Sequence, residues 1–335
     1  MSFNYSTKSY AIVADIGGTF ARFACVRLEN LAIDKVEIYT CAAFSSLEAV
    51  LLTYQEQYKL QEIKQVVIAI ACPVFDDMIC MTNTHWRFSI SALKQKLNLT
   101  ELKVLNDFNA IAMSLPALSA QQVFQIGRGT ANKDSVRAVL GAGTGLGVAY
   151  LISNELGYSA YAGEGGHVSW GAKTDQEWFI YCYLKKQYAH ISYERLLSGH
   201  GLENLYQALA ALNQKDNAPM PAAQIIAMAL AKQCAIAEAA VAQFFAILGS
   251  YAGDLALTFA AFGGIYIAGG IVPRLISLLH HSDFRVRFEE KGRFSEFNIQ
   301  IPTFIITAEQ PGILGAAVYL KQSLARSREA ESGMI

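Results

Sequence analysis

Charged residues are scarce in this sequence. Asp, Glu, Lys and Arg supply 16% of its 335 residues, whereas hydrophobic types supply 53%. This balance excludes a largely disordered chain, which would contain few apolar residues and many charged ones. The formal net charge of −1 gives no electrostatic reason to expect nucleic acid or an anionic membrane as a partner. The length favours two domains, since a single core rarely grows this large.

Cysteine motifs and targeting signals are also missing. No two of the six cysteines stand at the CxxC spacing of a structural zinc site. Several lie in apolar stretches, where a cysteine behaves as a small hydrophobic residue, so we expect reduced and buried thiols. The first ten residues lack the basic region and apolar core of a signal peptide. These absences predict a cytoplasmic protein without a structural zinc.

One uncharged run, Leu255–Pro273, is long enough to suggest a membrane span. Two glycine pairs and Pro273 divide it into shorter pieces. We therefore expect the end of a helix, a buried strand and a glycine loop in the core of a soluble protein, with no membrane partner.

Strand-like and helix-like patterns are mixed along the chain, which predicts an α/β fold. Short apolar runs predict strands at Tyr10–Asp15, Arg22–Arg27, Val66–Ala71, Lys103–Asn106, Val136–Leu140, Gly147–Ile152, Ile265–Ala268 and Thr303–Thr307. Helical patterns lie at Ser46–Tyr58, Ile90–Leu97, Asp107–Ser114, Asp175–Gln187, Pro221–Lys232, Ile236–Phe259 and Ile313–Ala325. The polar tail from Ser323 is expected to fray.

The common nucleotide-binding motifs are absent. There is no GxxxxGK[ST] and no well-placed GxGxxG, both of which put a helix directly after a glycine loop. Instead, a strand, a glycine loop and a second strand occur in order at Asp15–Thr19 and again at Gly141–Gly145. The repetition predicts two related α/β lobes that face each other and hold a phosphate chain in the cleft between them. A return of the final helix to the first lobe would make that lobe discontinuous.

The first glycine loop runs Ala14, Asp15, Ile16, Gly17, Gly18 and Thr19. Glycines let backbone N–H groups approach an anion, and a threonine hydroxyl can donate to a phosphate oxygen. Asp15 would then hold Mg²⁺ through water, since Mg²⁺ keeps several waters beside phosphates. An ordinary tight hairpin turn explains this loop equally well when it is taken alone.

Two later glycine segments add to this pattern. Gly143, Thr144 and Gly145 could cradle phosphate oxygens, although a glycine-rich turn or bulge is the simpler alternative. Gly269 and Gly270 would let an adenine ring lie close to the backbone, but alone they favour a buried strand with turn glycines. Two phosphate-type loops at equivalent positions are harder to dismiss than one.

The segment KVLNDFNAIA predicts a strand that ends at Asn106 and a helix that starts at Asp107. A carboxylate at this place can be a helix cap that the macrodipole keeps ionised. Alternatively, it stands at the carboxyl end of a strand, where α/β active sites collect. A kinase needs such a carboxylate beside the attacking hydroxyl. With an ordinary pKa of about 3.9, Asp107 would be ionised near neutral pH.

Polar side chains suited to a sugar follow later in the chain. Glu164 and His167 stand in GEGGHVSW, where glycines predict a loop, and Glu194 follows in ISYERLLSGHG. Sugar hydroxyls both donate and accept hydrogen bonds, and charged acceptors bind them most strongly. Asn106 would complete the set. For Glu194, a glutamate at a helix start or in a salt bridge is a strong alternative, and zinc at Glu164 and His167 is disfavoured because no cysteine or second histidine is near.

These segments together resemble the bacterial glucokinases, in order and over nearly the whole chain. The resemblance rests on AIVADIGGTFARF, VVIAIACPV, MTNTHWRFSI, VLNDFNAIA, GAGTGLGVAYL, GEGGHVSW, ISYERLLSGHGLENLY, IYIAGGIVPR, FEEKGRF and PGILGAAVYL. It implies a two-lobed actin/hexokinase-like fold, a duplicated ribonuclease-H-like unit with an active-site cleft between the lobes. The small lobe would comprise 1–117 and 308–327 and the large lobe 118–307, with 328–335 frayed.

The resemblance also implies a function: ATP and Mg²⁺ as cofactors, phosphorylation of glucose at its 6-hydroxyl, and a cytoplasmic homodimer. Asp107 would be the catalytic base, and Asn106, Glu164, His167 and Glu194 would bind the sugar. One departure is Phe20, where the family commonly has Asn. Because Phe20 stands beside the first glycine loop, we expect this exchange to affect the affinity for the nucleotide. The chain also lacks the cysteine-rich zinc motif of a second group of bacterial sugar kinases.

Three alternatives remain open at this point. A kinase for another hexose or an amino sugar differs only in pocket detail. An actin-like or Hsp70-like nucleotide-gated protein is disfavoured by GEGGH and by the lack of a client-binding domain. A sugar-responsive transcription regulator would need a helix-turn-helix and a basic face, whereas this N-terminus enters a strand almost at once.

Overall fold

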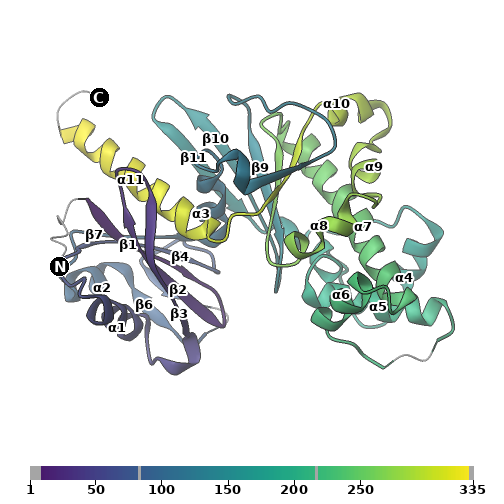
Figure 1. Ribbon diagram of the computed structural model, residues 1–335, viewed down its shortest axis with the longest axis horizontal. Helices are drawn as coiled ribbons and strands as arrows, with labels where there is room; N and C mark the ends of the chain where they lie inside the picture. Colours follow the sequence, from purple (N-terminus) through teal and green to yellow (C-terminus); the bar gives the residue numbers. More distant parts are fainter. Residues whose placement is uncertain (1–8, 82–83, 216–217, 332–335) are drawn as a thin grey trace. The chain divides into compact units, whose positions relative to one another are not determined.

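The computed structural model describes residues 9–81, 84–215 and 218–331 (Figure 1). The chain divides into two compact units, each of which is described by itself. Unit 1 comprises Met1–Ser119, Ser153–Tyr161 and Ala308–Ile335, and unit 2 comprises Ala120–Ile152 and Ala162–Thr307. Unit 1 is therefore built from three separate stretches of the sequence.

Unit 1 is built on a five-stranded sheet in the order β3-β2-β1-β4-β7. Strands β1, β4 and β7 are parallel neighbours, while β1, β2 and β3 form an antiparallel meander. The strand bounds are β1 Tyr10–Ile16, β2 Phe20–Arg27, β3 Ala32–Thr40, β4 Gln65–Ile70 and β7 Glu101–Asn106. A separate two-stranded sheet joins β5 Met78–Cys80 to β6 Arg87–Ser89.

Helices cover both faces of this sheet, which explains why β4 is buried along its whole length. Side chains alternate between the faces: Ile12 and Ile16 pack in one core cluster, whereas Val13 packs in the other. The first cluster includes buried residues of α1 Leu47–Tyr58 and α2 Ile90–Lys96. The second includes those of α3 Asp107–Ser114 and α11 Pro311–Glu331. The final helix thus completes the core of unit 1.

Unit 2 contains a six-stranded sheet in the order β11-β10-β9-β12-β13-β8. Strand β12 is parallel to β9 and β13, whereas β10 and β8 pair antiparallel with β9 and β13. The bounds are β8 Val123–Ile126, β9 Arg137–Ala142, β10 Leu146–Asn154, β11 Gly157–Gly163, β12 Ile265–Ala268 and β13 Thr303–Ile306.

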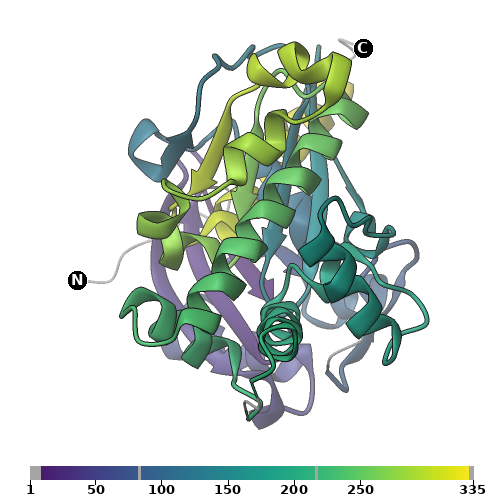
Figure 2. The same ribbon diagram turned by 90° about the vertical axis from the view of Figure 1, so that its right-hand side faces the viewer.

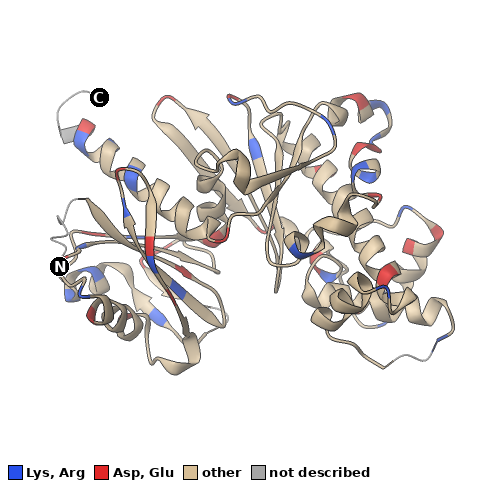
Figure 3. Ribbon diagram, in the orientation of Figure 1, with Lys and Arg blue, Asp and Glu red and all other residues tan. Residues whose placement is uncertain are grey.

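The long helix α7, Ala235–Phe259, forms the centre of the unit 2 core (Figure 2). It contains no Lys or Arg (Figure 3) and is apolar enough to cross a membrane by composition alone, but 78% of its most apolar window is buried inside the protein. A Cβ at Gly249 would overlap the Phe284 carbonyl, so that glycine lets α9 approach closely. The other helices are α4 Asp175–Lys185, α5 Gly199–Leu212, α6 Ala222–Leu230, α8 Ile276–Leu279, α9 Phe284–Glu289 and α10 Ser295–Ile299.

The structure confirms the two predicted strand–loop–strand hairpins as β1–β2 and β9–β10. It also confirms that Leu255–Pro273 consists of a helix end, the buried strand β12 and a glycine loop. Helix α11 continues through Glu331, so the part of the tail that precedes residue 332 is helical and not frayed, and 332–335 lie outside the described residues. The elements that were not predicted are the strands β3, β5, β6, β8 and β11 and the helices α5, α8, α9 and α10.

Candidate active site

The carboxyl ends of three parallel strands meet at one edge of the unit 1 sheet. Ile16 at the end of β1 pairs with Ile70 of β4, which pairs with Asn106 at the end of β7. The first glycine loop follows β1 directly, and Asp107 follows β7. In open α/β sheets this edge is where ligands bind. The sheet register therefore brings the first glycine loop and the Asn-Asp pair to the same edge.

Asn106, and not Asp107, caps helix α3. Its side-chain oxygen accepts hydrogen bonds from the backbone N–H groups of Phe108, at 2.9 Å, and Asn109, at 3.3 Å. Its amide nitrogen donates to the Cys72 carbonyl at 3.4 Å. Asp107 is the first helical residue, with one carboxylate oxygen accepting from Phe108 N–H at 2.9 Å. The capping role considered for Asp107 is thus filled by its neighbour.

Burial raises the pKa of Asp107 to about 7, and the nearby Asp15 carboxylate adds to the rise. Hydrogen bonds from the start of α3 oppose the shift but are too weak to cancel it. The expectation of an ordinary pKa near 3.9 was therefore wrong, because the sequence could not show this burial. A carboxylate whose pKa lies near neutral pH is suited to accept a proton.

The first glycine loop is a tight hairpin turn in which Gly17 N–H donates to the Phe20 carbonyl at 3.0 Å. Asp15 at its start lies 3.7 Å from the Arg22 guanidinium. Burial raises the pKa of Asp15, and Arg22 partly offsets this. A Cβ added to Gly312, in the first turn of α11, would lie 2.7 Å from an Asp15 carboxylate oxygen. The N-terminus of α11 therefore approaches this carboxylate, which its dipole favours in the ionised form.

In unit 2, the two later glycine loops lie side by side. Strands β9 and β12 are parallel, with Ala268 opposite Gly141, so the loops that follow them leave the same edge of the sheet. Gly269 adopts a φ of +90°, and a Cβ there would collide with the backbone of Ala142. Gly143 has open space around its Cα. An anion or a flat ring could therefore approach the backbone here.

A second group of contacts connects the Gly143–Gly145 loop to the polar residues predicted for the sugar. The Glu194 carboxylate accepts from Leu146 N–H at 2.9 Å, directly after the loop. Gly199 N–H, in the first turn of α5, donates to the Gly143 carbonyl at 2.8 Å. The sequence reasoning missed this role of α5, although Ser198 three residues before Gly201 is a helix-cap signal.

Glu164, His167 and Glu194 come together in unit 2. His167 Nε2 lies 3.9 Å from a Glu164 carboxylate oxygen and 4.0 Å from one of Glu194. The side chains of Glu164 and His167 are 71% and 60% exposed, so they can meet a ligand. Within 9–81, 84–215 and 218–331, no three His, Cys, Asp or Glu residues are arranged to hold a metal ion. The cluster offers two carboxylates and an imidazole to hydroxyl groups.

The loop that carries Glu164 and His167 is fixed from one side by residues that the sequence reasoning did not single out. His190 Nε2 hydrogen-bonds to the His167 carbonyl oxygen at 2.8 Å. Trp170 N–H donates to the Ile191 carbonyl at 2.9 Å, and Ser169 bridges to Ser192. These backbone contacts have no sequence signature, because they depend on which loops the fold places together.

Each of the two α/β units contains a hairpin whose glycine loop lies where the parallel strands of its sheet end. This arrangement defines the two-lobed class of actin/hexokinase-like proteins. A crystal structure of a ROK-family glucokinase from Streptomyces griseus, in complex with glucose and AMPPNP, shares this fold, with a TM-score of 0.64 at 19% identity over 95% of this chain and 99% of that one.

The chain belongs to the glucokinase family. The family model matches residues 12–323. The glucokinase of Colwellia psychrerythraea is 45% identical over 328 residues, which cover 96% of this chain and 99% of that protein. The crystal structure of a glucokinase from an Antarctic psychrotroph has a TM-score of 0.84 and 37% identity, and the alignment covers 93% of this chain and 98% of that chain. These matches confirm the resemblance to bacterial glucokinases.

Proposed function

We propose that this chain transfers the γ-phosphoryl group of ATP to the 6-hydroxyl of D-glucose, with Asp107 as the base. The observation that carries the proposal is a half-buried carboxylate directly after β7, whose pKa is raised to about 7 by desolvation. It stands in a chain whose residues 12–323 match the glucokinase family. Phosphoryl transfer needs little covalent help, so positioning and charge stabilisation should supply most of the rate.

Glucose is assigned to Asn106, Glu164, His167 and Glu194, together with Asp107. The polar cluster of unit 2 supports the part of this assignment that concerns Glu164, His167 and Glu194, since each carboxylate retains accepting capacity for sugar hydroxyls. Asp107 accepts the proton of the 6-hydroxyl as that oxygen attacks the γ-phosphorus. Asn106 holds the start of α3 and thereby fixes the position of Asp107.

The nucleotide is assigned to the three glycine loops. Backbone N–H groups of Ala14–Thr19 and of Gly143, Thr144 and Gly145 would bind the phosphates, and Gly269 and Gly270 would lie against the adenine. Asp15 fits a Mg²⁺ held through water, because burial disfavours its charged form and a cation would restore it. The bound Mg²⁺ would neutralise charge that develops on the phosphates.

Two further assignments rest on the family alone. A homodimer and a cytoplasmic location are inferred from the resemblance to bacterial glucokinases. A kinase for another hexose or an amino sugar is the nearest alternative function, because it would use the same base and the same phosphate loops.

A coupled assay of the purified protein with ATP, Mg²⁺ and a panel of hexoses tests the proposal. We expect strong turnover on glucose. Turnover on a different hexose would keep the mechanism and change the substrate. ATP binding without turnover on any sugar would contradict the kinase assignment, unless Phe20→Asn restores activity. Phe20 is 53% exposed beside the first loop, so the exchange should not disturb the core.

A further inference from the structure

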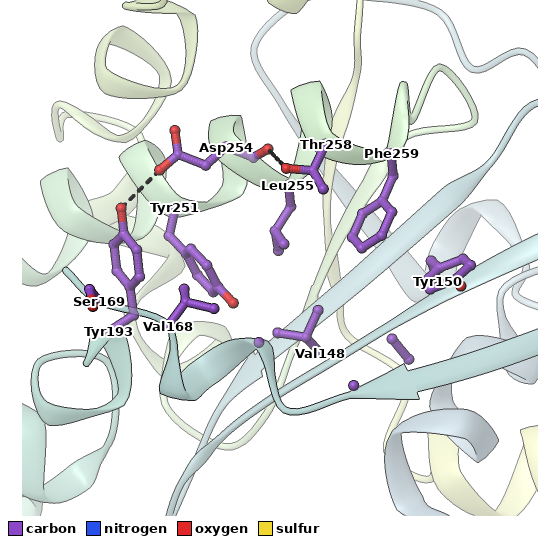
Figure 4. Close-up of a pocket in the computed structure, with 13 residues that line it drawn as sticks. Val148, Tyr150, Val168, Ser169, Tyr193, Tyr251, Asp254, Leu255, Thr258 and Phe259 are labelled. Atoms are coloured by element: carbon purple, nitrogen blue, oxygen red, sulfur yellow. Dashed lines mark hydrogen bonds between the residues drawn. The ribbon is translucent and has the colours of Figure 1, made fainter. Parts of the chain in front are cut away.

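Unit 2 contains a pocket that none of the roles assigned above uses. It has a volume of about 350 Å³, within the range of small-molecule sites. It lies between the last turns of α7, strand β10 and the segment that follows β11 (Figure 4). Its walls are mostly apolar and aromatic, with Tyr150 stacked on Phe259 at 4.6 Å and with Val148 and Leu255 nearby. The pocket is therefore shaped for an apolar ligand body.

Tyr251 places an unpartnered hydroxyl in this wall. The residue is 2% exposed, and its oxygen has no hydrogen-bond partner. Its ring stacks on Tyr193 at 4.2 Å, and Figure 4 shows the hydroxyl pointing into the pocket toward Val148. A buried hydroxyl without a partner is unfavourable, so natural proteins rarely retain one without a reason. Burial raises the pKa of Tyr251, so the group stays protonated and can donate.

The side chains of Tyr193, Asp254 and Thr258, which also line the pocket, already have partners. Tyr193 donates to Asp254 at 2.8 Å, and Lys291 donates to the second oxygen of Asp254 at 2.5 Å. The Thr258 hydroxyl donates to the Asp254 carbonyl at 2.7 Å. The charge of Asp254 is thus balanced by Lys291, so the described lining residues offer the buried hydroxyl of Tyr251 and the exposed hydroxyl of Ser169 but no unpaired charge.

We propose that this pocket binds a small neutral aromatic molecule whose carbonyl oxygen accepts a hydrogen bond from Tyr251. The aromatic body packs against Val148, Leu255 and the Tyr150–Phe259 pair. A neutral ligand is required because no unpaired charge faces it. The ligand carbonyl supplies the hydrogen-bond acceptor that the Tyr251 hydroxyl lacks. Binding therefore removes the free-energy cost of a buried hydroxyl without a partner.

Occupancy of the pocket should change the affinity for glucose, and this part rests on the function proposed above. Gly163, Gly165, Val168 and Ser169 line the pocket. In the sequence, the first two flank Glu164 and the last two directly follow His167. A ligand against one side of this segment would restrain the residues assigned to glucose on the other. Thermodynamic linkage requires the two ligands to affect each other by the same factor.

The test uses acetophenone as the probe and fluorobenzene as a ring without a carbonyl. Ligand-observed NMR titrations of the full chain should give a millimolar dissociation constant for acetophenone, as is usual for so small a ligand. Fluorobenzene should bind about fivefold more weakly. Tyr251→Phe should remove the difference between the two, and Thr258→Trp, which fills the pocket from its exposed side, should abolish the binding of both.

Tyr251→Phe should also leave the melting temperature unchanged or higher, because it deletes a buried hydroxyl that has no partner. Glucose should shift the dissociation constant of acetophenone at least twofold, and acetophenone should shift the affinity for glucose by the same factor. Equal binding of both probes to the wild type, or binding that survives Thr258→Trp, would overturn the site. A marked loss of stability in Tyr251→Phe would mean that a trapped water already accepts from the Tyr251 hydroxyl, and this would also overturn the site.

Probe binding that glucose does not change would overturn the coupling alone. Because the titrations do not depend on catalysis, they separate failure of this site from failure of the kinase assignment.

Discussion

Asp107 combines two features that raise a carboxyl pKa, burial and a nearby carboxylate. In the assigned mechanism it must be ionised to accept a proton. We expect kcat/KM to rise with pH through about 7 and to level off above that. A pH profile of kcat/KM for glucose measures this. The acidic limb should shift to lower pH in Asp15→Asn, which removes the neighbouring charge, whereas a limb near pH 4 in the wild type would contradict the assignment.

Removal of the Asp107 carboxylate separates catalysis from folding. Asp107→Asn should lower kcat by about 10²–10⁴ while the KM for glucose changes only a few-fold. The α3 cap should persist, since Asn106 supplies it. Steady-state kinetics and circular dichroism measure the two effects. If activity and structure were lost together, Asp107 would be a structural residue and not the base.

The same substitution should change how stability depends on pH. The folded pKa of Asp107, about 7, lies above its ordinary value of 3.8, so the folded state binds more protons between these values. Stability in the wild type should therefore fall as pH rises across that window, all else being equal, and Asp107→Asn should remove this contribution. Urea unfolding at several pH values for both proteins measures the difference.

Among the elements, the contact between Glu194 and the second glycine loop is the most informative. The carboxylate accepts from Leu146 N–H, and it is also assigned to glucose. Glu194→Ala should raise the KM for glucose about 10-fold or more and the KM for ATP about fivefold. Glu164→Ala is the matched control, because no hydrogen bond of Glu164 to that loop is seen in the structure. An equal effect of both variants on the KM for ATP would argue against the link.

The packing of α11 on α3 depends on a glycine. A Cβ at Gly315 would overlap the carbonyl oxygen of Ala110. Gly315→Ala should destabilise the protein by about 1–3 kcal/mol and lower the melting temperature by several degrees. Gly199→Ala, where a Cβ would meet only ordinary contacts, should not lower it. Differential scanning calorimetry distinguishes the two variants, and equal melting temperatures would contradict the close approach.

At the scale of the whole molecule, unit 1 depends on a helix that returns from the far end of the chain. Ile313, Ala316, Ala317 and Leu320 are fully buried in the core cluster of unit 1. A chain that stops after Thr307 should therefore fail to fold unit 1 and should aggregate or lose its cooperative unfolding transition. A chain that stops after Glu331 keeps α11 and should behave as the wild type. Solubility and calorimetry compare them.

Local patterns were sufficient for much of this protein. Short apolar runs located the strands β1, β2, β4, β7, β9, β10, β12 and β13, because burial in a sheet leaves a short-range signature. Glycine-rich loops located both hairpins, since only certain turns bring two strands together. Strand β3, in which no side chain is fully buried, gave no such signature.

The sequence by itself determined the α/β class, the two hairpins and, through resemblance, the glucokinase family. The tertiary structure decided the features of the site that depend on contacts between residues far apart in the sequence. It made Asn106 the cap in place of Asp107, raised the pKa of Asp107 by burial, and placed Glu194 against Leu146, 48 residues earlier. It also left the Tyr251 hydroxyl facing a pocket without a partner. Burial and pairing of polar groups are properties of neighbours in space, which spacing along a chain does not specify.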